Sequence, residues 1–163
     1  GGLPVGAYAS SHEIMSKISP EGDVYQAGTL SGNPVAMAAG IAQLGECLKP
    51  AFYTSIERKT KFLVDSISAN PQSQILNLKF FTIGSIFWIA FTDKEKIQSA
   101  EEIDPTSMNI FKVLHKELLE RGIYLGPSGY EVGFISEAHS ETDIKKTATV
   151  FSEAMNIVIE NQK

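Results

Sequence analysis

Tyr25-Gln-Ala-Gly-Thr-Leu-Ser-Gly-Asn-Pro34 is a polar, glycine-punctuated stretch that leads directly into an apolar helical segment. Asn33 is suited to cap that helix, and Pro34 suits its first turn, where a missing N–H costs nothing. Gly28 and Gly32 allow the backbone to turn and to approach a ligand closely. Unpaired N–H groups and the helix dipole both favour an anion such as phosphate at a loop of this kind. By its spacing alone, the stretch is still more typical of a plain helix-entry loop.

The composition is that of an ordinary globular protein, with 163 residues of which 43% are hydrophobic and 20% charged. A net charge of -5 disfavours nonspecific binding to nucleic acid, and the apolar runs are too short to span a bilayer. Cys47 is the only cysteine, which excludes an internal disulfide. Its spacing to the three histidines is not that of a metal site, so we expect no bound metal. A reducing, cytoplasmic location fits this cysteine usage.

Residues 1–50 are expected to hold a short strand, a short helix and a long helix. We expect the strand at Leu3–Ser10 and the short helix at His12–Ile18. The long helix, Pro34–Leu48, is apolar on nearly all sides and rich in alanine. A helix without a polar face is typical of a buried position, and its small side chains favour close packing against neighbouring backbone or another subunit. Where those partners are missing, its apolar surface should be exposed.

Residues 51–163 show the alternation of a small α+β domain. Phe52–Ala69 has one apolar stripe and charged residues elsewhere, as in an amphipathic surface helix. The later segments are expected to be two strands within Ile75–Thr92 around Gly84, an exposed connection over Asp93–Asp104, a helix over Thr106–Arg121, a third strand at Ile123–Leu125, and a last helix that begins at the capping box Ser140–Asp143. This order, α-β-β-α-β-α, predicts a short sheet with helices on one face.

Four segments together resemble one enzyme family. They are Gly1-Gly-Leu-Pro-Val-Gly-Ala-Tyr8, the stretch Tyr25–Pro34, Gly126-Pro-Ser-Gly-Tyr-Glu-Val-Gly-Phe134 and Ser136-Glu-Ala-His-Ser-Glu-Thr-Asp-Ile144. In this order they are similar to the segments that follow the cofactor lysine in class III pyridoxal-phosphate aminotransferases, and in particular in an aminomutase branch. The resemblance runs from Gly1 to about Ile159, with Asn70–Pro105 poorly matched. Tyr130 stands where the branch would have phenylalanine.

The resemblance implies a fold and domain boundaries. It identifies the chain as the C-terminal part of a fold-type I pyridoxal-phosphate-dependent transferase, which is an α/β protein. Residues 1–50 would form the end of the large cofactor-binding domain, and residues 51–163 the small C-terminal α+β domain. In the family, the lysine that holds pyridoxal phosphate lies shortly before the position of Gly1. We therefore expect this chain to lack that lysine and to be inactive alone.

The resemblance also implies site residues. Gly28 and Thr29 match positions that bind the phosphate of pyridoxal phosphate across the interface of a homodimer, so that two subunits would share each active site. Glu131 matches an active-site glutamate that faces substrate and cofactor, and we expect it to be both catalytic and substrate-binding. Ser128 is expected nearby as a second substrate-binding residue. Without the resemblance, Glu131 would be interpreted as a solvated loop carboxylate. For His139 we expect a bond to local backbone rather than a catalytic role.

The activity that the resemblance implies is an internal transamination. It would convert glutamate-1-semialdehyde into 5-aminolevulinate, the tetrapyrrole precursor, with pyridoxal phosphate and its pyridoxamine form as cofactor and without an external amino donor. Two alternatives stay open. One is an ordinary class III aminotransferase, which moves an amino group between two substrates. The other is a noncatalytic assembly or binding domain, in which the glycine-rich loop and the apolar helix would serve only packing.

Overall fold

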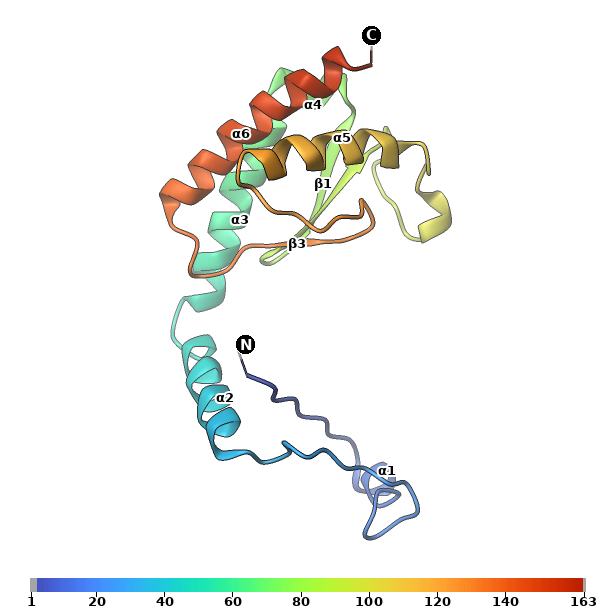
Figure 1. The fold of residues 1–163 in the computed structure, drawn as a ribbon, viewed down its shortest axis with the longest axis vertical. Helices are drawn as coiled ribbons and strands as arrows, with labels where there is room; N and C mark the ends of the chain where they lie inside the picture. The colour runs from blue at the N-terminus through green and yellow to red at the C-terminus, as the bar shows by residue number, and fades with distance from the viewer. Residues whose placement is uncertain (1–2, 163) are drawn as a thin grey trace. The chain divides into compact units, whose positions relative to one another are not determined.

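The computed structural model describes residues 3–162, and the chain divides into two compact units, Gly1–Pro50 and Ala51–Lys163 (Figure 1). Gly1 and Gly2, the first residues of the resembling segments, lie outside the described range. Within that range, no helix is both long enough and apolar enough to cross a membrane. Nor do three His, Cys, Asp or Glu side chains of residues 3–162 gather as a metal site would require.

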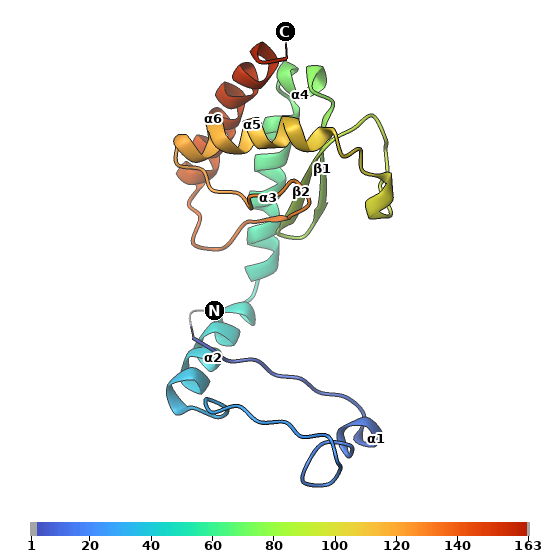
Figure 2. The ribbon, with the colours of Figure 1, turned by 45° about the vertical axis from the view of Figure 1, so that its right-hand side comes forward.

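The first unit contains two helices joined by extended chain (Figure 2). Helix α1, His12–Met15, is shorter than predicted because the chain turns after it, and Ile18 then pairs with Val24 in a parallel bridge. Helix α2 spans Pro34–Cys47, close to the predicted bounds. The predicted strand at Leu3–Ser10 is wrong. This segment pairs with no other strand among residues 3–162, and a strand needs the N–H and C=O groups of a neighbour.

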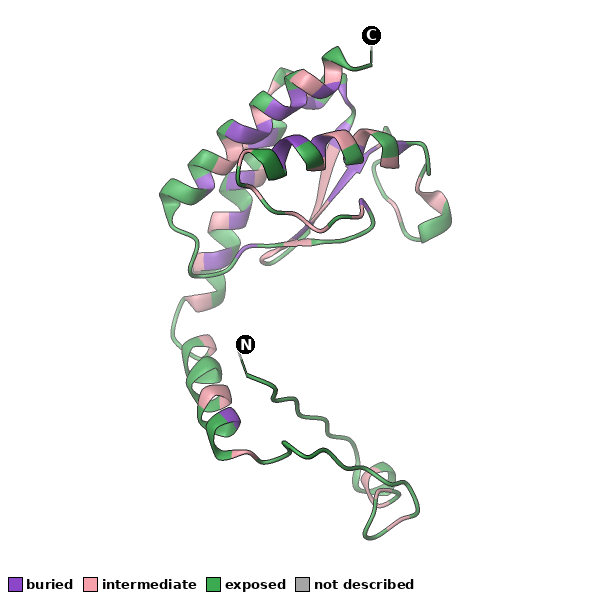
Figure 3. Ribbon diagram, in the orientation of Figure 1, coloured by how far each residue is buried: buried purple, intermediate pink, exposed green. Residues whose placement is uncertain are grey.

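Helix α2 is exposed along most of its length, as the green ribbon in Figure 3 shows. Ala36 is the one buried residue among residues 3–50. Val35, Ile41 and Leu44 keep 66%, 73% and 64% of their surface exposed. The burial expected for a helix that is apolar all round is therefore not observed within this chain. The exposed apolar surface expected in the absence of packing partners is observed.

The second unit is a small α+β domain. Its helices are α3 (Phe52–Ser68), α4 (Pro71–Ile75), α5 (Ser107–Glu120) and α6 (Glu141–Glu160), its strands are β1 (Leu78–Ile83), β2 (Ile86–Phe91) and β3 (Gly133–Phe134), and a short 3-10 helix, η1, covers Ala100–Glu102. The strands form one antiparallel sheet in the order β1-β2-β3. The hairpin β1–β2 turns at Gly84, where φ is 56°. The two strands predicted around Gly84 are therefore confirmed, and they form a hairpin.

The third strand of the sheet is β3, and the strand predicted at Ile123–Leu125 is wrong. The backbone of that segment is used to end α5. Gly122 has a φ of 80°, and the Ile123 N–H donates to the Leu118 carbonyl at 2.9 Å. This is the usual closure of a helix by a left-handed glycine. Backbone groups that are engaged in this way are not available for a strand ladder.

The core of the second unit lies between one face of the sheet and the helices α3, α5 and α6, which gather on that face in both views (Figures 1 and 2). Phe80 and Ile89 are register partners on this face. The most deeply buried side chains are Leu63, Ile67, Leu114, Leu118, Phe151, Met155 and Val158. The other face carries Phe81 and Trp88, whose ring centroids lie 5.4 Å apart. The helices thus cover one face, as the order of elements predicts.

Candidate functional site

The glycine-rich loop of the first unit folds into two consecutive turns before α2. The Ser31 N–H donates to the Gly28 carbonyl at 2.9 Å, and the Asn33 N–H donates to the Leu30 carbonyl at 3.0 Å. Gly32 has a φ of 69°, in the left-handed region that glycine adopts without strain. The two turns border a hollow of about 320 Å³. The loop therefore presents its backbone to a space large enough for a small ligand group.

The loop supplies donors for an anion more directly than the helix end does. Among residues 3–162, the N–H groups of Gly28, Thr29 and Leu30 donate to no carbonyl. The first two N–H groups of α2, in contrast, donate to the Asn33 side chain at 3.1 and 3.2 Å. Gly28 lies so close to Ser31 that an added Cβ would come within 2.8 Å of the Ser31 hydroxyl oxygen. Free N–H groups, the Thr29 hydroxyl and a residue without a side chain together suit a phosphate group.

A second polar turn lies between α5 and β3 and carries Ser128 and Glu131. The Glu131 N–H donates to the Ser128 carbonyl at 3.0 Å. The Ser128 hydroxyl accepts the Tyr130 N–H at 3.3 Å. The Glu131 carboxylate lies against Gly126, where an added Cβ would overlap its Oε2 atom. The structure thus brings Ser128 and Glu131 together in one turn, and the observed position of the Glu131 side chain requires a glycine at position 126.

This turn borders a hollow of about 660 Å³ in the second unit. Glu131 is exposed and lines the hollow, as do His139 and Lys146. The His139 Nδ1 atom accepts the Ser136 N–H at 2.9 Å. The prediction that His139 bonds local backbone is therefore confirmed. The Glu131 carboxylate remains accessible to a small polar molecule.

The four predicted site residues fall into two pairs. Gly28 and Thr29 belong to the first unit, and Ser128 and Glu131 belong to the second. Within each unit, the two members of a pair lie in the same turn. In chemical terms the first pair can hold an anion through N–H and O–H donors. The second pair can hold a cation or an ammonium group through the Glu131 carboxylate.

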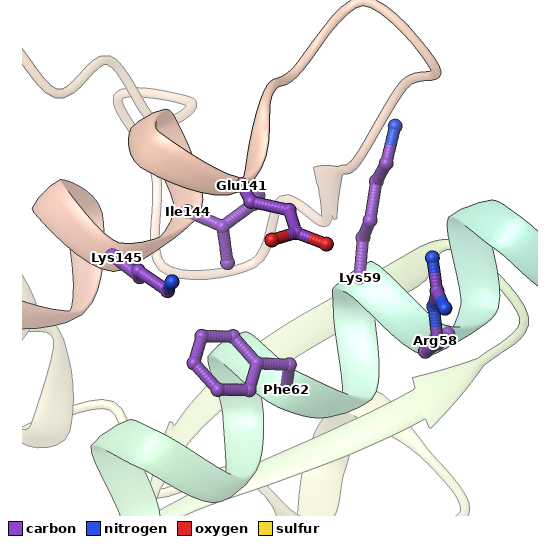
Figure 4. Close-up of a pocket in the computed structure, with 6 residues that line it drawn as sticks. All are labelled: Arg58, Lys59, Phe62, Glu141, Ile144 and Lys145. Carbon is purple, nitrogen blue, oxygen red and sulfur yellow. The ribbon is translucent and has the colours of Figure 1, made fainter.

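A cleft between α3 and α6 is a further concave feature of the second unit (Figure 4). It measures about 250 Å³ and is lined by Arg58, Lys59 and Phe62 from α3 and by Glu141, Ile144 and Lys145 from the start of α6. The Lys59 ammonium group donates to the Glu137 carboxylate at 3.1 Å, and this hydrogen bond lowers the pKa of Glu137. Cations and a carboxylate share the cleft, and it holds none of the predicted site residues. We therefore assign it no part in the chemistry.

Trp88 is a residue near the site that the sequence reasoning does not single out. It is the only tryptophan of the chain. Its indole Nε1–H donates to the Gly129 carbonyl, inside the Ser128–Glu131 turn, at 2.7 Å. A partly buried tryptophan usually needs an acceptor for this N–H. A single tryptophan in a predicted strand is therefore the sequence signal that could have identified this residue. The sequence does not indicate which carbonyl accepts the hydrogen bond from its indole N–H.

Comparison with known proteins places the chain in a family. The family model for aminotransferase class III matches residues 1–155, and the chain belongs to this family. Glutamate-1-semialdehyde 2,1-aminomutase from Akkermansia muciniphila is 47% identical over 147 residues. The enzyme of the same name from Thermodesulfovibrio yellowstonii is 44% identical over 147 residues. Each match covers 90% of this chain and 34% of the relative, so the chain spans about a third of the length of these relatives.

A solved structure supports the fold. A transaminase with PLP bound superposes on the chain with a TM-score of 0.75 at 25% identity. The superposition covers 94% of this chain and 35% of the transaminase chain. The predicted fold class, part of an α/β pyridoxal-phosphate-dependent transferase, is therefore confirmed.

Proposed function

We propose that this chain is the C-terminal part of a glutamate-1-semialdehyde 2,1-aminomutase. Such an enzyme converts glutamate-1-semialdehyde into 5-aminolevulinate by moving an amino group within one molecule, a step of tetrapyrrole synthesis. One observation carries the proposal: curated relatives of that name are 44% and 47% identical over 90% of the chain. A match of that extent necessarily includes both the glycine-rich loop and the turn with Glu131.

The cofactor in this proposal is pyridoxal phosphate, with its pyridoxamine form in the catalytic cycle. Gly28 and Thr29 would hold the phosphate, because their N–H groups donate to no carbonyl among residues 3–162. Thr29 adds a hydroxyl donor. Gly28 has no side chain, so the position that a Cβ would occupy beside Ser31 stays unfilled. The bound cofactor supplies the electron sink that amino-group transfer requires. The lysine that holds its aldehyde is expected upstream of Gly1.

Glu131 would act on the substrate. Its exposed carboxylate borders the 660 Å³ hollow and can pair with the ammonium group of an amino-acid-like molecule. A carboxylate held beside that nitrogen is also placed to take part in proton movement. Ser128 offers a hydroxyl in the same turn, although that oxygen already accepts the Tyr130 N–H. We therefore assign the larger part to Glu131 and an accessory part to Ser128.

We further propose a homodimer in which Gly28 and Thr29 serve the active site of the neighbouring subunit. Support comes from α2, which follows the loop directly and exposes apolar side chains such as Val35 and Ile41. Apolar surface of this kind is typical of a region that is covered in an assembly. A cytoplasmic location agrees with the single free cysteine, Cys47.

The test of this function uses the full-length product of the gene, loaded with cofactor, and glutamate-1-semialdehyde as the only substrate. We expect 5-aminolevulinate to form without an added amino donor. If product forms only when a second amino acid is present, the protein is an ordinary aminotransferase and the mutase proposal is wrong. Glu131→Gln keeps the side-chain volume and removes the charge, so this variant should retain cofactor absorbance while its turnover falls.

A further inference from the structure

The turn that carries Glu131 has few bonds of its own. Two local hydrogen bonds join its members, both to Ser128, at 3.0 Å from the Glu131 N–H and at 3.3 Å from the Tyr130 N–H. Tyr130 and Glu131 are exposed, and the turn belongs to no helix or strand. A segment with so few bonds opens easily unless the rest of the domain holds it. The defined position of Glu131 therefore depends on contacts from outside the turn.

Gly129, in the middle of the turn, is the point at which these outside contacts act. It is buried, unlike its neighbours in the turn. An added Cβ at this position would come within 2.7 Å of Met108 Sδ and 3.0 Å of Phe111 Cγ, so the backbone is packed closely against α5. The Gly129 carbonyl accepts the Trp88 indole N–H at 2.7 Å. The turn is thus packed against a helix and also bonded to the sheet.

Trp88 is itself well anchored. It lies on β2 and is the register partner of Phe81 on β1. The two rings are tilted by 31°, with their centroids 5.4 Å apart. A side chain on a paired strand is a more rigid support than one on a loop. Phenylalanine at position 88 would keep an aromatic ring on β2 but would lack the indole N–H donor, and it is also smaller than the indole.

We propose that Trp88 is a positioning residue for Glu131. Its indole N–H holds the Gly129 carbonyl and thereby fixes the part of the turn from which the Glu131 carboxylate extends over Gly126. Trp88 touches neither substrate nor cofactor in this role and acts only through the turn. The inference rests on the proposed function of Glu131, and it adds a residue on the sheet to the site.

The test is the substitution Trp88→Phe in the full-length, cofactor-loaded protein. This substitution keeps an aromatic ring on β2 and removes the indole N–H donor. Loss of one hydrogen bond should lower kcat/KM about three- to tenfold. Amide hydrogen exchange in the segment 126–133 should become faster, and cofactor affinity should stay unchanged. The matched control is Phe81→Leu, which removes the ring that contacts Trp88 on β1 but leaves the indole N–H in place. This control should change kcat/KM and exchange in the segment much less.

A second comparison decides whether Trp88 acts through Glu131. In a Glu131→Gln background, Trp88→Phe should cause no further loss of kcat/KM, because the group that it positions is already disabled. Additive losses would overturn the inference and leave Trp88 with a general structural role. Unchanged exchange and unchanged activity in Trp88→Phe alone would overturn it as well. An inactive wild-type protein would instead reject the proposed function, so the two failures are distinguishable.

Discussion

Gly126, Gly129 and Gly133 each lie where a side chain would collide with a neighbour. A Cβ would overlap the Glu131 carboxylate at position 126, an α5 side chain at position 129 and the Phe87 ring at position 133. These glycines therefore permit close packing, and their φ values are not in the left-handed region. Their shared effect is that the Glu131 turn lies directly on the sheet and on α5. At the scale of single residues, the geometry of the candidate site therefore depends on these three glycines as well as on the side chains that line it.

Thr29 offers the most direct test of the phosphate loop. Thr29→Val keeps the shape of the side chain and removes its hydroxyl group. A hydrogen bond to a charged group contributes roughly 1.5–3 kcal/mol, so the affinity of the full-length enzyme for pyridoxal phosphate should fall by about tenfold to a hundredfold. Titration of the apoenzyme, followed by cofactor absorbance, measures this change.

The control for that prediction is Thr29→Ser, which retains the hydroxyl and should bind the cofactor nearly as well as the wild type. Equal affinities for the valine and serine variants would show that the hydroxyl does not contact the phosphate.

The start of α6 shows how an element can be specified by neighbouring residues alone. The Ser140 hydroxyl accepts the Asp143 N–H at 3.1 Å, and the Asp143 carboxylate accepts the Ser140 N–H at 2.8 Å. The capping box predicted from these two residues is therefore confirmed. Hydrogen bonds from the Ser140 hydroxyl and then from its backbone lower the pKa of Asp143.

The lowered pKa of Asp143 predicts a pH dependence of stability. Because the pKa in the folded state lies below the ordinary value of 3.8, the ionised carboxylate stabilises the fold above that value. The contribution disappears as the pH falls through the folded-state pKa. The free energy of unfolding should therefore be higher for the wild type than for Asp143→Asn near neutral pH, and the two should converge in acid.

Denaturant titrations of the two proteins over a pH series measure this difference. Glu141→Gln is the matched control, since Glu141 lies in the same first turn but outside the capping box. A gap between wild type and Asp143→Asn that stays constant down to the lowest pH would contradict the assignment.

Helix α4 and strand β3 show two different limits of sequence reasoning. Asn70-Pro71 repeats the Asn-Pro signal of Asn33-Pro34, and the Asn70 side chain accepts the Gln72 N–H at 3.1 Å. That helix could have been predicted from local sequence. Strand β3, in contrast, has only 2 residues. It forms because its backbone pairs with β2. No residue pattern within so short a segment predicts that pairing.

At the scale of the whole molecule, the two units differ in how much core each possesses. The buried hydrophobic cluster consists entirely of residues from the second unit, whereas Ala36 is the one buried residue described in the first. We expect residues 51–163, expressed alone, to unfold cooperatively, and residues 1–50 to show no cooperative transition. Urea titration followed by circular dichroism distinguishes the two behaviours.

Variants on α5 sharpen this prediction. Leu114 is 0% exposed, and Leu119 on the same helix is 49% exposed. Leu114→Ala should lower the free energy of unfolding of residues 51–163 by about 2–5 kcal/mol. Leu119→Ala removes the same atoms from a half-exposed position and should cost much less. Similar losses for the two variants, or a broad transition in the parent, would show that this unit has no packed core of its own.

The proposed dimer predicts complementation between two impaired subunits. Thr29→Val should be combined with a variant that lacks the cofactor lysine, at a limiting cofactor concentration. In the mixed dimer, one site carries both defects, while the other combines an intact lysine with an intact Thr29. Activity should therefore exceed that of either parent. If heterodimers form, as native mass spectrometry can show, and activity is not recovered, the sites are not shared between subunits.

The sequence by itself determined the family and the elements whose stabilising bonds are local. The Asn33 cap of α2, the capping box of α6 and the turn at Gly84 each join residues a few positions apart, so spacing and residue type were sufficient to predict them. Only the tertiary structure decided which segment became the third strand and what holds Glu131 in place. The Trp88–Gly129 bond joins residues 41 positions apart. Such a bond forms only after the sheet and α5 have packed together, and no local pattern encodes that packing.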